Sequence, residues 1–178
     1  MENNASAKVY IGFITYNDGT AKYLHYFLSS LKHQAYENIE ILAIDNSEEE
    51  DNGNSRFIKN NYPKIDFKRS GENIGFAKGY NQMIQKAIDS GAKYFLALNP
   101  DMILEADSIS QLLDAMASDD KIAAVQPKIL KWDFEKNIKT DIVDSRGIIC
   151  DQKFRFRDDK QGQADADEID AVKDIFGF

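Results

Sequence analysis

The sequence contains little cysteine and no long hydrophobic run. Its 178 residues include one cysteine, Cys150, so no disulfide can form within the chain and nothing signals an oxidising compartment. The start, MENNASAKVY, lacks the basic beginning and long apolar centre of a signal peptide. The longest apolar runs are far shorter than a membrane span. We therefore expect a soluble intracellular protein.

Positive charge is also scarce. Lys and Arg number 22 against 30 Asp and Glu, for a formal charge of −8. Nucleic acid is disfavoured as a partner, because its phosphate backbone requires clustered basic residues and no patch of basic and aromatic residues is apparent. A nucleotide stays compatible as a small ligand, since a few local groups can hold one diphosphate. With 43% apolar residues, the chain is long enough for one domain with a substantial core.

Strand-like and helix-like patterns alternate along the chain. Residues 8–17, KVYIGFITYN, are apolar on both faces, which is typical of a strand buried in a parallel sheet. Further strands are predicted at 39–47, 64–70 and 93–99. Helices are predicted at 21–34, in a short segment opened by Glu48–Asp51, from Phe76 to a stop at Gly91, and over 106–118 with Asp107 or Ser108 as its cap.

This alternation predicts an α/β protein with a doubly wound, mostly parallel sheet and helices on both faces. The stripe predicted to face the sheet from the third helix consists of Phe76, Tyr80, Met83, Ile84, Ala87 and Ile88. Extended segments at 122–130 and 139–151 are expected to add short antiparallel strands at the sheet edge. The acidic segment 158–170 is expected to be a mobile surface loop.

Common nucleotide-binding signatures are missing. The first predicted strand is followed by TYNDGT, which lacks the Gly-x-Gly-x-x-Gly turn of dinucleotide binders, and the phosphate loop of NTPases does not occur. A Rossmann dehydrogenase and a kinase-like NTPase are therefore disfavoured. A nucleotidyltransferase is less favoured too, because such enzymes usually have a Gly-rich loop and a basic residue at this point.

Polar residues follow three of the predicted strands. In open α/β sheets, ligands bind outside the carboxyl ends of the strands. A lone aspartate there more often caps or turns the chain. Three such ends on neighbouring strands favour a site instead. The residues are Thr15, Tyr16 and Asn17 after the first strand, Asp45 and Asn46 after the second, and Asn99 and Asp101 after the fourth.

Three glycines precede and enter the third predicted helix. Gly71, Gly75 and Gly79 are four residues apart, and glycine costs about 1 kcal/mol against alanine inside a helix. Two explanations stay open: close approach by a ligand or backbone, and tight packing of the helix on the sheet.

Other reactive residue types lack partners at useful spacings. His25 and His33 have no further ligands at metal spacing and are expected to be surface or packing residues. Cys150, in an apolar stretch, is expected in the core rather than as a nucleophile. Trp132 with Phe134 could form a sugar platform, although an aromatic pair on an edge strand is the more usual arrangement.

Taken in order, the motifs resemble family-2 glycosyltransferases with the GT-A fold. They are most similar to the rhamnosyltransferase-like branch, which acts in surface polysaccharide assembly. The resemblance spans nearly the whole chain from Val9 on. The matching segments are ITYN at 14–17, IDNS at 44–47, ENIGFAKGYN at 72–81, LNPD at 98–101, VQPKIL at 125–130 and DSRGIICD at 144–151.

The resemblance implies a nucleotide-sugar pocket. Asp45 would accept hydrogen bonds from the base or ribose, and the pocket would be lined by Thr15, Tyr16 and Asn17. The wall beside the nucleotide and its diphosphate would be formed by Asn73, Gly75, Phe76, Ala77 and Asn81.

The resemblance also implies a metal ion. Asn99-Pro100-Asp101 stands where relatives have Asp-x-Asp, so Asp101 would bind Mg²⁺ or Mn²⁺. Mg²⁺ commonly uses one or two carboxylates together with substrate phosphates, so one aspartate is sufficient. Asn99 removes one negative charge, which would either weaken metal binding or leave its side chain to contact the sugar or phosphate.

The implied function is the donor-binding domain of a metal-assisted, inverting glycosyltransferase. It would transfer a sugar from a nucleotide-diphospho-sugar, dTDP-rhamnose or a UDP-sugar, to a saccharide or lipid-linked acceptor. In the family the general base and acceptor pocket follow a segment resembling DIFGF, so the catalytic base is expected beyond Phe178. The alternative is a non-catalytic nucleotide-sugar-binding or interaction module that lacks the acceptor half.

The expected organisation has three parts. Residues 1–7 are a disordered N-terminus, 8–155 the nucleotide-sugar-binding GT-A domain, and 156–178 an acidic loop with the start of a truncated acceptor-side region. A missing acceptor half would expose apolar surface, so we expect a tendency to form a homodimer. The expected location is cytoplasmic, including peripheral association with the inner membrane face, where relatives often meet lipid-linked acceptors.

Overall fold

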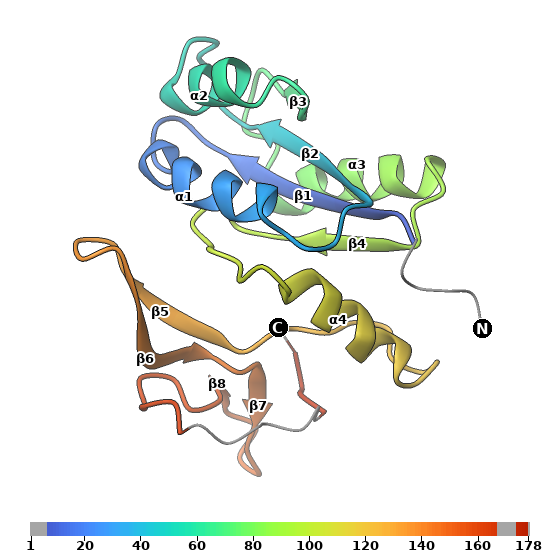
Figure 1. The fold of residues 1–178 in the computed structure, drawn as a ribbon, viewed down its shortest axis with the longest axis vertical. Helices are drawn as coiled ribbons and strands as arrows, with labels where there is room; N and C mark the ends of the chain where they lie inside the picture. Colours follow the sequence, from blue (N-terminus) through green and yellow to red (C-terminus); the bar gives the residue numbers. More distant parts are fainter. Residues whose placement is uncertain (1–6, 167–173, 178) are drawn as a thin grey trace. The chain divides into compact units, whose positions relative to one another are not determined.

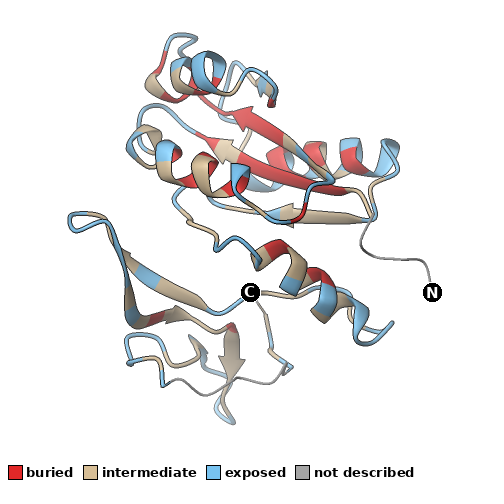
Figure 2. Cartoon of the chain, viewed as in Figure 1, coloured by how far each residue is buried: buried red, intermediate tan, exposed pale blue. Residues whose placement is uncertain are grey.

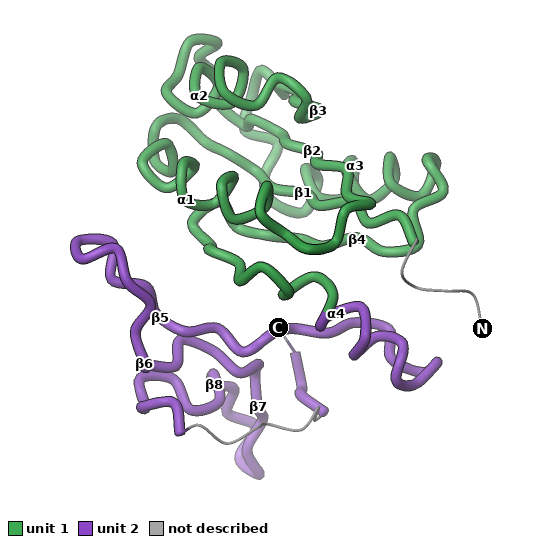
Figure 3. The backbone as a smooth tube through the Cα atoms, viewed as in Figure 1, with its two compact units in different colours: residues 1–110 green, residues 111–178 purple. Residues whose placement is uncertain are grey.

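The computed structural model describes residues 7–166 and 174–177, which belong to two compact units, 1–110 and 111–178 (Figures 1 and 3). The predicted disorder at the N-terminus falls almost entirely outside the described residues. The division after Ser110 comes earlier than the functional boundary predicted after residue 155, which stays a prediction.

The first unit is built on a parallel sheet of four strands in the order β3-β2-β1-β4. The strands are β1 Val9–Thr15, β2 Ile39–Asp45, β3 Asp66–Arg69 and β4 Tyr94–Ala97. The chain adds β2 and β3 on one side of β1 and then places β4 on the other side, so the strand order reverses between β1 and β4. Open α/β sheets bind their ligands at the carboxyl ends of the strands next to such a reversal.

Helices cover both faces of this sheet, as predicted (Figure 1). On one face, Phe13 of β1 packs edge-on against Phe27, with ring centroids 5.1 Å apart. On the other face, Tyr10 belongs to a buried cluster with Tyr80 and Met83. Figure 2 shows that the buried residues of this unit concentrate where helices meet strands. The helices of this unit are α1 Ala21–Lys32, α2 Gly53–Asn61 and α3 Phe76–Asp89. The fourth helix, α4 Ser108–Ala117, spans the division between the two units.

None of the helices in the described part of the chain is both long and apolar enough to cross a membrane.

The start of α2 differs from the prediction. The helix begins at Gly53 rather than within Glu48–Asp51. Asn52 determines this start, because its side chain accepts a hydrogen bond from the Ser55 N–H (2.9 Å) while the Ser55 hydroxyl accepts from the Asn52 N–H (3.4 Å). This capping box satisfies the backbone N–H groups of Asn52 and Ser55 at the start of the helix.

The buried stripe of α3 is narrower than predicted. It consists of Gly79, Tyr80, Met83 and Ala87, whereas Phe76 and Ile88 are 65% and 62% exposed. Helix α3 ends as predicted, with Gly91 directly after its cap in a left-handed conformation (φ 71°).

Two different constraints explain the glycine spacing. A Cβ atom on Gly79 would lie 2.6 Å from the Ile14 Cδ1 atom of β1, so Gly79 permits tight packing of α3 on the sheet. Gly75 instead has a φ of 79° and open space where a Cβ would point, so it meets a backbone requirement at the helix start.

Replacing Gly79 with valine is therefore expected to destabilise the protein. The added methyl groups would meet the end of the Ile14 side chain, which must adopt a strained rotamer or hold α3 away from β1, at a cost of about 1–3 kcal/mol. Urea unfolding measures the loss. Lys78→Val is the matched control, because Lys78 is exposed on the same helix and should cost only about 0.5 kcal/mol of helix propensity. Equal losses in the two variants would contradict the packing explanation.

The second unit contains two small antiparallel sheets. Strand β5, Ile129–Asp133, pairs with β6, Ile138–Ser145, and β7, Ile148–Cys150, pairs with β8, Phe156–Asp158. Short antiparallel additions near the C-terminus are thus confirmed. They pair with each other, however, and not with β4, because each finds a partner nearby in sequence.

The acidic segment is only partly described, and its first part is not the free loop that was predicted. The Val143 N–H of β6 donates to the Gln163 carbonyl (2.9 Å), and the Asp165 N–H donates to the Asp141 carbonyl (2.6 Å). These bonds attach residues up to Asp165 to β6. The rest of the predicted loop, 167–170, lies outside the described residues.

Candidate functional site

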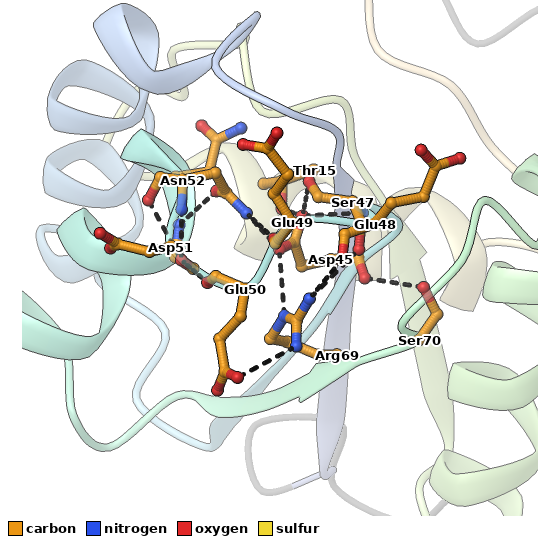
Figure 4. A network of polar contacts seen from close by, with 12 residues as sticks. Thr15, Asp45, Ser47, Glu48, Glu49, Glu50, Asp51, Asn52, Arg69 and Ser70 are labelled. Carbon is orange, nitrogen blue, oxygen red and sulfur yellow. Dashed lines mark hydrogen bonds and ion pairs between the residues drawn. The ribbon is translucent and has the colours of Figure 1, made fainter.

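Asp45 is the centre of a polar network at the carboxyl edge of the sheet (Figure 4). It is the last residue of β2 and is fully buried. Its Oδ1 accepts from the Thr15 hydroxyl (3.1 Å) and the Ser47 hydroxyl (2.6 Å). Its Oδ2 accepts from the Asn52 amide (2.8 Å) and lies 4.0 Å from the Arg69 Nε. Asp45 therefore joins the ends of β1, β2 and β3 to the start of α2.

The structure thus brings Thr15 and Asp45 together, as the prediction of a shared pocket requires. It also places both below the surface, at 1% and 0% exposure. Within the described residues, both carboxylate oxygens of Asp45 already have protein donors. A hydrogen bond from a base or ribose to Asp45 stays a prediction. The structure shows the hydrogen bonds of Asp45 to Thr15, Ser47 and Asn52.

The loop after β1 presents Tyr16 outward. The Tyr16 side chain is 44% exposed, and the next residue, Asn17, has a φ of 50° that asparagine tolerates better than most residues. The Asn17 N–H donates to the Ser47 hydroxyl (2.6 Å), and its carbonyl accepts from the buried Asn54 amide. The loop is therefore held on both sides of Tyr16 and leaves the aromatic ring available to a ligand.

The start of α3 lies beside the end of β2. The Asn46 amide donates to the Gly75 carbonyl (3.3 Å), and the Gly75 N–H donates to the Asn73 Oδ1 (3.0 Å). Asn46 is buried, at 3% exposure. The sequence placed it among the polar strand ends, but the resemblance did not assign it to the pocket. The exposed side chains of the predicted pocket wall are those of Asn73, Phe76, Ala77 and Asn81.

The segment after β4 turns sharply, which is typical of an Asn-Pro dipeptide. The Met102 N–H donates to the Asn99 carbonyl (3.3 Å), Pro100 is buried, and Asn99 and Asp101 are exposed. Just before the turn, the Leu98 N–H donates to the Gly12 carbonyl of β1 (3.0 Å). Asn99 and Asp101 therefore follow a segment attached to β1, next to the reversal of strand order.

Tyr80 is a positioning residue that the sequence analysis treated only as core. Its hydroxyl donates to the Leu98 carbonyl (2.8 Å), which links α3 to the residue before Asn99. Burial raises the pKa of Tyr80 to about 12. The hydroxyl therefore stays protonated and keeps this link at any physiological pH. Its place within ENIGFAKGYN was the available signal.

Replacing Tyr80 with phenylalanine is expected to remove that link at a cost of about 1 kcal/mol. It should also weaken metal-dependent nucleotide binding, because the Asn99–Asp101 turn loses an anchor. Tyr62→Phe is the control for binding, since Tyr62 lies at the end of α2 and away from β4.

The wild type and Tyr80→Phe together also test the raised pKa of Tyr80. The folded protein favours protonated Tyr80, so this contribution is fully present below pH 10 and is lost as the pH rises from about 10 through about 12. The shift corresponds to about 3 kcal/mol of unfolding free energy. Urea unfolding across this range should show a steeper loss in the wild type than in Tyr80→Phe. Parallel curves would contradict the assignment.

The donors at the β4 turn fit a hard divalent ion only in part. The described residues contain no group of three or more His, Cys, Asp or Glu side chains that could hold a metal. Asp101 offers an exposed carboxylate without an ion pair to any described Lys or Arg, and Asn99 offers an amide oxygen close in sequence. Mg²⁺ and Mn²⁺ accept such oxygen donors when substrate phosphates complete the coordination.

The remaining candidates belong to other elements of the chain. His25 and His33 are exposed on or next to α1, where the His33 Nδ1 lies 2.7 Å from the Ser29 carbonyl. Cys150, at the end of β7, is half-buried and is a free cysteine, and so is not in the core as expected. Trp132 lies within β5 and is half-buried.

The fold and this edge define an open α/β domain with a polar site at the reversal of strand order. The chain belongs to glycosyl transferase family 2, whose family model matches residues 10–170. A comparison with curated proteins found no match.

Solved structures share the fold at low sequence identity. One is the mannosyltransferase PcManGT from Pyrobaculum calidifontis in complex with GDP-Man and Mn²⁺, with a TM-score of 0.51 and 17% identity over 70% of this chain and 34% of that one. Another is residues 1–349 of S. aureus TarS in complex with UDP, with a TM-score of 0.50 and 17% identity over 70% and 39%. The likeness establishes the GT-A fold. The chain spans less than half the length of either protein.

Proposed function

We propose that this chain is the donor-binding domain of a metal-assisted, inverting glycosyltransferase that uses a nucleotide-diphospho-sugar. The observation that carries the proposal is the convergence of three strand ends at one edge of the sheet. Tyr16, Asn46 and Asp101 each follow a different strand, and hydrogen bonds attach those strand ends to one another and to α3. Membership of the family supports transfer of a sugar from a nucleotide donor in general terms.

In this proposal the residues divide the donor between them. Tyr16 and Asn17, with Thr15 and Asp45 beneath them, hold the base and ribose. The start of α3, from Asn73 to Asn81, lines the diphosphate side. Asn99 and Asp101 would hold Mg²⁺ or Mn²⁺, which would stabilise the negative charge on the departing nucleoside diphosphate.

The finer identity of the substrates rests on sequence motifs. The rhamnosyltransferase-like pattern is compatible with dTDP-rhamnose and with a UDP-sugar as the donor. The acceptor is proposed to be a saccharide or a lipid-linked saccharide in surface polysaccharide synthesis, with the enzyme in the cytoplasm or at the inner membrane face. TarS with UDP and PcManGT with GDP-Man and Mn²⁺ support the donor class, since both share the fold.

Asn99 favours a second candidate function. It replaces the first carboxylate of the family's Asp-x-Asp motif, which suits a module that binds nucleotide-sugars without transferring them. Turnover of dTDP- and UDP-sugars, measured with and without an added acceptor-side region, separates the two. Release of nucleoside diphosphate that appears with this region supports the enzyme, and binding without release in either case supports the module.

Calorimetric titration with UDP and dTDP, each with and without Mn²⁺, tests the proposal that both functions share. We expect one of these nucleotides to bind, and the ion to strengthen the binding. Affinity that is equal with and without Mn²⁺ would contradict the metal-assisted site.

A further inference from the structure

The β7–β8 hairpin carries alternating basic and aromatic residues that all face solvent. They are Lys153, Phe154, Arg155, Phe156 and Arg157. Phe154 is 82% exposed and Phe156 is 56% exposed. The sequence analysis found no basic-aromatic patch, because the whole chain is acidic, and the structure corrects this.

A third aromatic side chain, from near the C-terminus, enlarges the patch. Phe176 is 67% exposed, and its ring centroid lies 4.8 Å from that of Phe156. Its backbone is attached to β7, because the Phe176 N–H donates to the Ile148 carbonyl (2.9 Å) and the Ile148 N–H donates to the Gly177 carbonyl (2.8 Å). Two segments distant in sequence therefore build one exposed aromatic surface.

Asp151 shapes the tip of the hairpin. Its Oδ1 accepts from the Lys153 and Arg155 N–H groups (2.8 and 3.1 Å), and its Oδ2 pairs with the Arg155 guanidinium (2.7 Å). These bonds, chiefly the one from the Arg155 side chain, hold the pKa of Asp151 below its usual value. Phe154 follows Lys153 with a φ of 56°, a conformation uncommon for an aromatic residue. The turn thus holds Phe154 outward, while Arg155 is paired with Asp151.

We propose that this hairpin, residues 148–158 with Phe176, docks the protein on an anionic lipid surface. Transfer of exposed aromatic side chains into the interface of a bilayer is energetically favourable, and basic residues beside them are attracted to anionic headgroups. A chain of net charge −8 is repelled by such a surface unless positive charge is concentrated where contact is made. Lys153 and Arg157 provide positive charge on either side of the aromatic residues, in addition to the paired Arg155. The Asp158 carboxylate that follows them accepts from the Ser145 hydroxyl (2.7 Å) and is half-buried.

The charges favour a lipid surface over a second copy of the chain. In a twofold dimer through this hairpin, the same patch would face itself and bring like charges together. An anionic bilayer has the complementary charge, and its interfacial region can accommodate aromatic rings.

Flotation with vesicles tests the proposal on the full chain. We expect binding to vesicles of mixed phosphatidylcholine and phosphatidylglycerol, weakened by salt, and none to phosphatidylcholine alone. Phe154→Ala should lower the partition coefficient about tenfold. Arg157→Glu should lower it at least about fivefold. Ile88→Ala and Lys121→Glu are matched controls, since both residues are exposed elsewhere, and neither change should affect binding.

The variants must also melt like the wild type and keep its nucleotide affinity, which separates this proposal from the donor site. Absence of binding to anionic vesicles, or binding that Phe154→Ala and Arg157→Glu leave unchanged, would overturn the proposal. So would a concentration-dependent dimer that Phe154→Ala abolishes while lipid binding is absent, because the patch would then be a self-association surface.

Discussion

Replacing Asp45 with alanine is expected to destabilise the protein by about 3–5 kcal/mol, close to the whole stability of a marginal domain. The carboxylate is fully buried and accepts hydrogen bonds from Thr15, Ser47 and Asn52. Its removal leaves the Thr15 and Ser47 hydroxyls buried without this acceptor and takes one of two acceptors from the Asn52 amide. It also removes one of the two carboxylates that lie 4.0 Å from Arg69. Each unsatisfied donor costs about 1–3 kcal/mol.

Urea unfolding measures this loss, with Asp101→Ala as the matched control. Asp101 is also an aspartate after a strand of the same sheet, but it is exposed, so its replacement should change stability by no more than about 0.5 kcal/mol. Asp45→Asn keeps the shape of the side chain but turns an amide N–H₂ group toward existing donors, and should also destabilise. A loss below about 1 kcal/mol in Asp45→Ala would contradict the central position of this network.

The second large effect concerns ligand binding rather than stability. Asp101→Ala should reduce metal-dependent nucleotide affinity by about 100-fold, equivalent to about 2.7 kcal/mol, because the only carboxylate of the Asn-Pro-Asp turn is lost. Asn99→Asp should act in the opposite direction and strengthen Mn²⁺-dependent binding, since a second carboxylate adds a charged oxygen donor. An Asn99→Asp variant with weaker binding would mean that the Asn99 amide contacts the sugar or phosphate.

Much of the fold could be predicted from local patterns. The continuous apolar runs at 8–17 and 39–47 became β1 and β2, and Gly91 ended α3 as its position indicated. The start of α2 was wrong because a side-chain bond between Asn52 and Ser55 outweighed the acidic run before it. The pairing of β5 with β6 could not be read from sequence, because a strand pattern does not specify its partner.

The position of the site could be predicted from the sequence, but the hydrogen bonds within it could not. Thr15 and Asp45 come together because parallel strands in register end side by side. That Asp45 would be enclosed by Ser47 and Asn52 depends on how the following loop folds back, which no local pattern encodes. The anchoring bond from Tyr80 to Leu98 likewise depends on the packing of α3 on the sheet.

The basic-aromatic hairpin was missed for a different reason. The basic and aromatic residues are visible in the sequence KFRFR at 153–157. The net charge of −8 over the whole chain, however, hides this local positive segment. Such a pattern forms a surface patch only if its aromatic side chains are exposed. The exposed fractions of Phe154 and Phe156 come only from the structure.

The central claim is that the carboxyl edge of the sheet binds a nucleoside diphosphate through Asp101 and a divalent ion. Calorimetric titration of UDP and dTDP into the wild type, Asp101→Ala and the exposed control Asp114→Ala, each with and without Mn²⁺, tests it most directly. The account predicts Mn²⁺-dependent binding in the wild type and Asp114→Ala that is lost in Asp101→Ala. Equal affinity in all three proteins, or no nucleotide binding by the wild type, would contradict it.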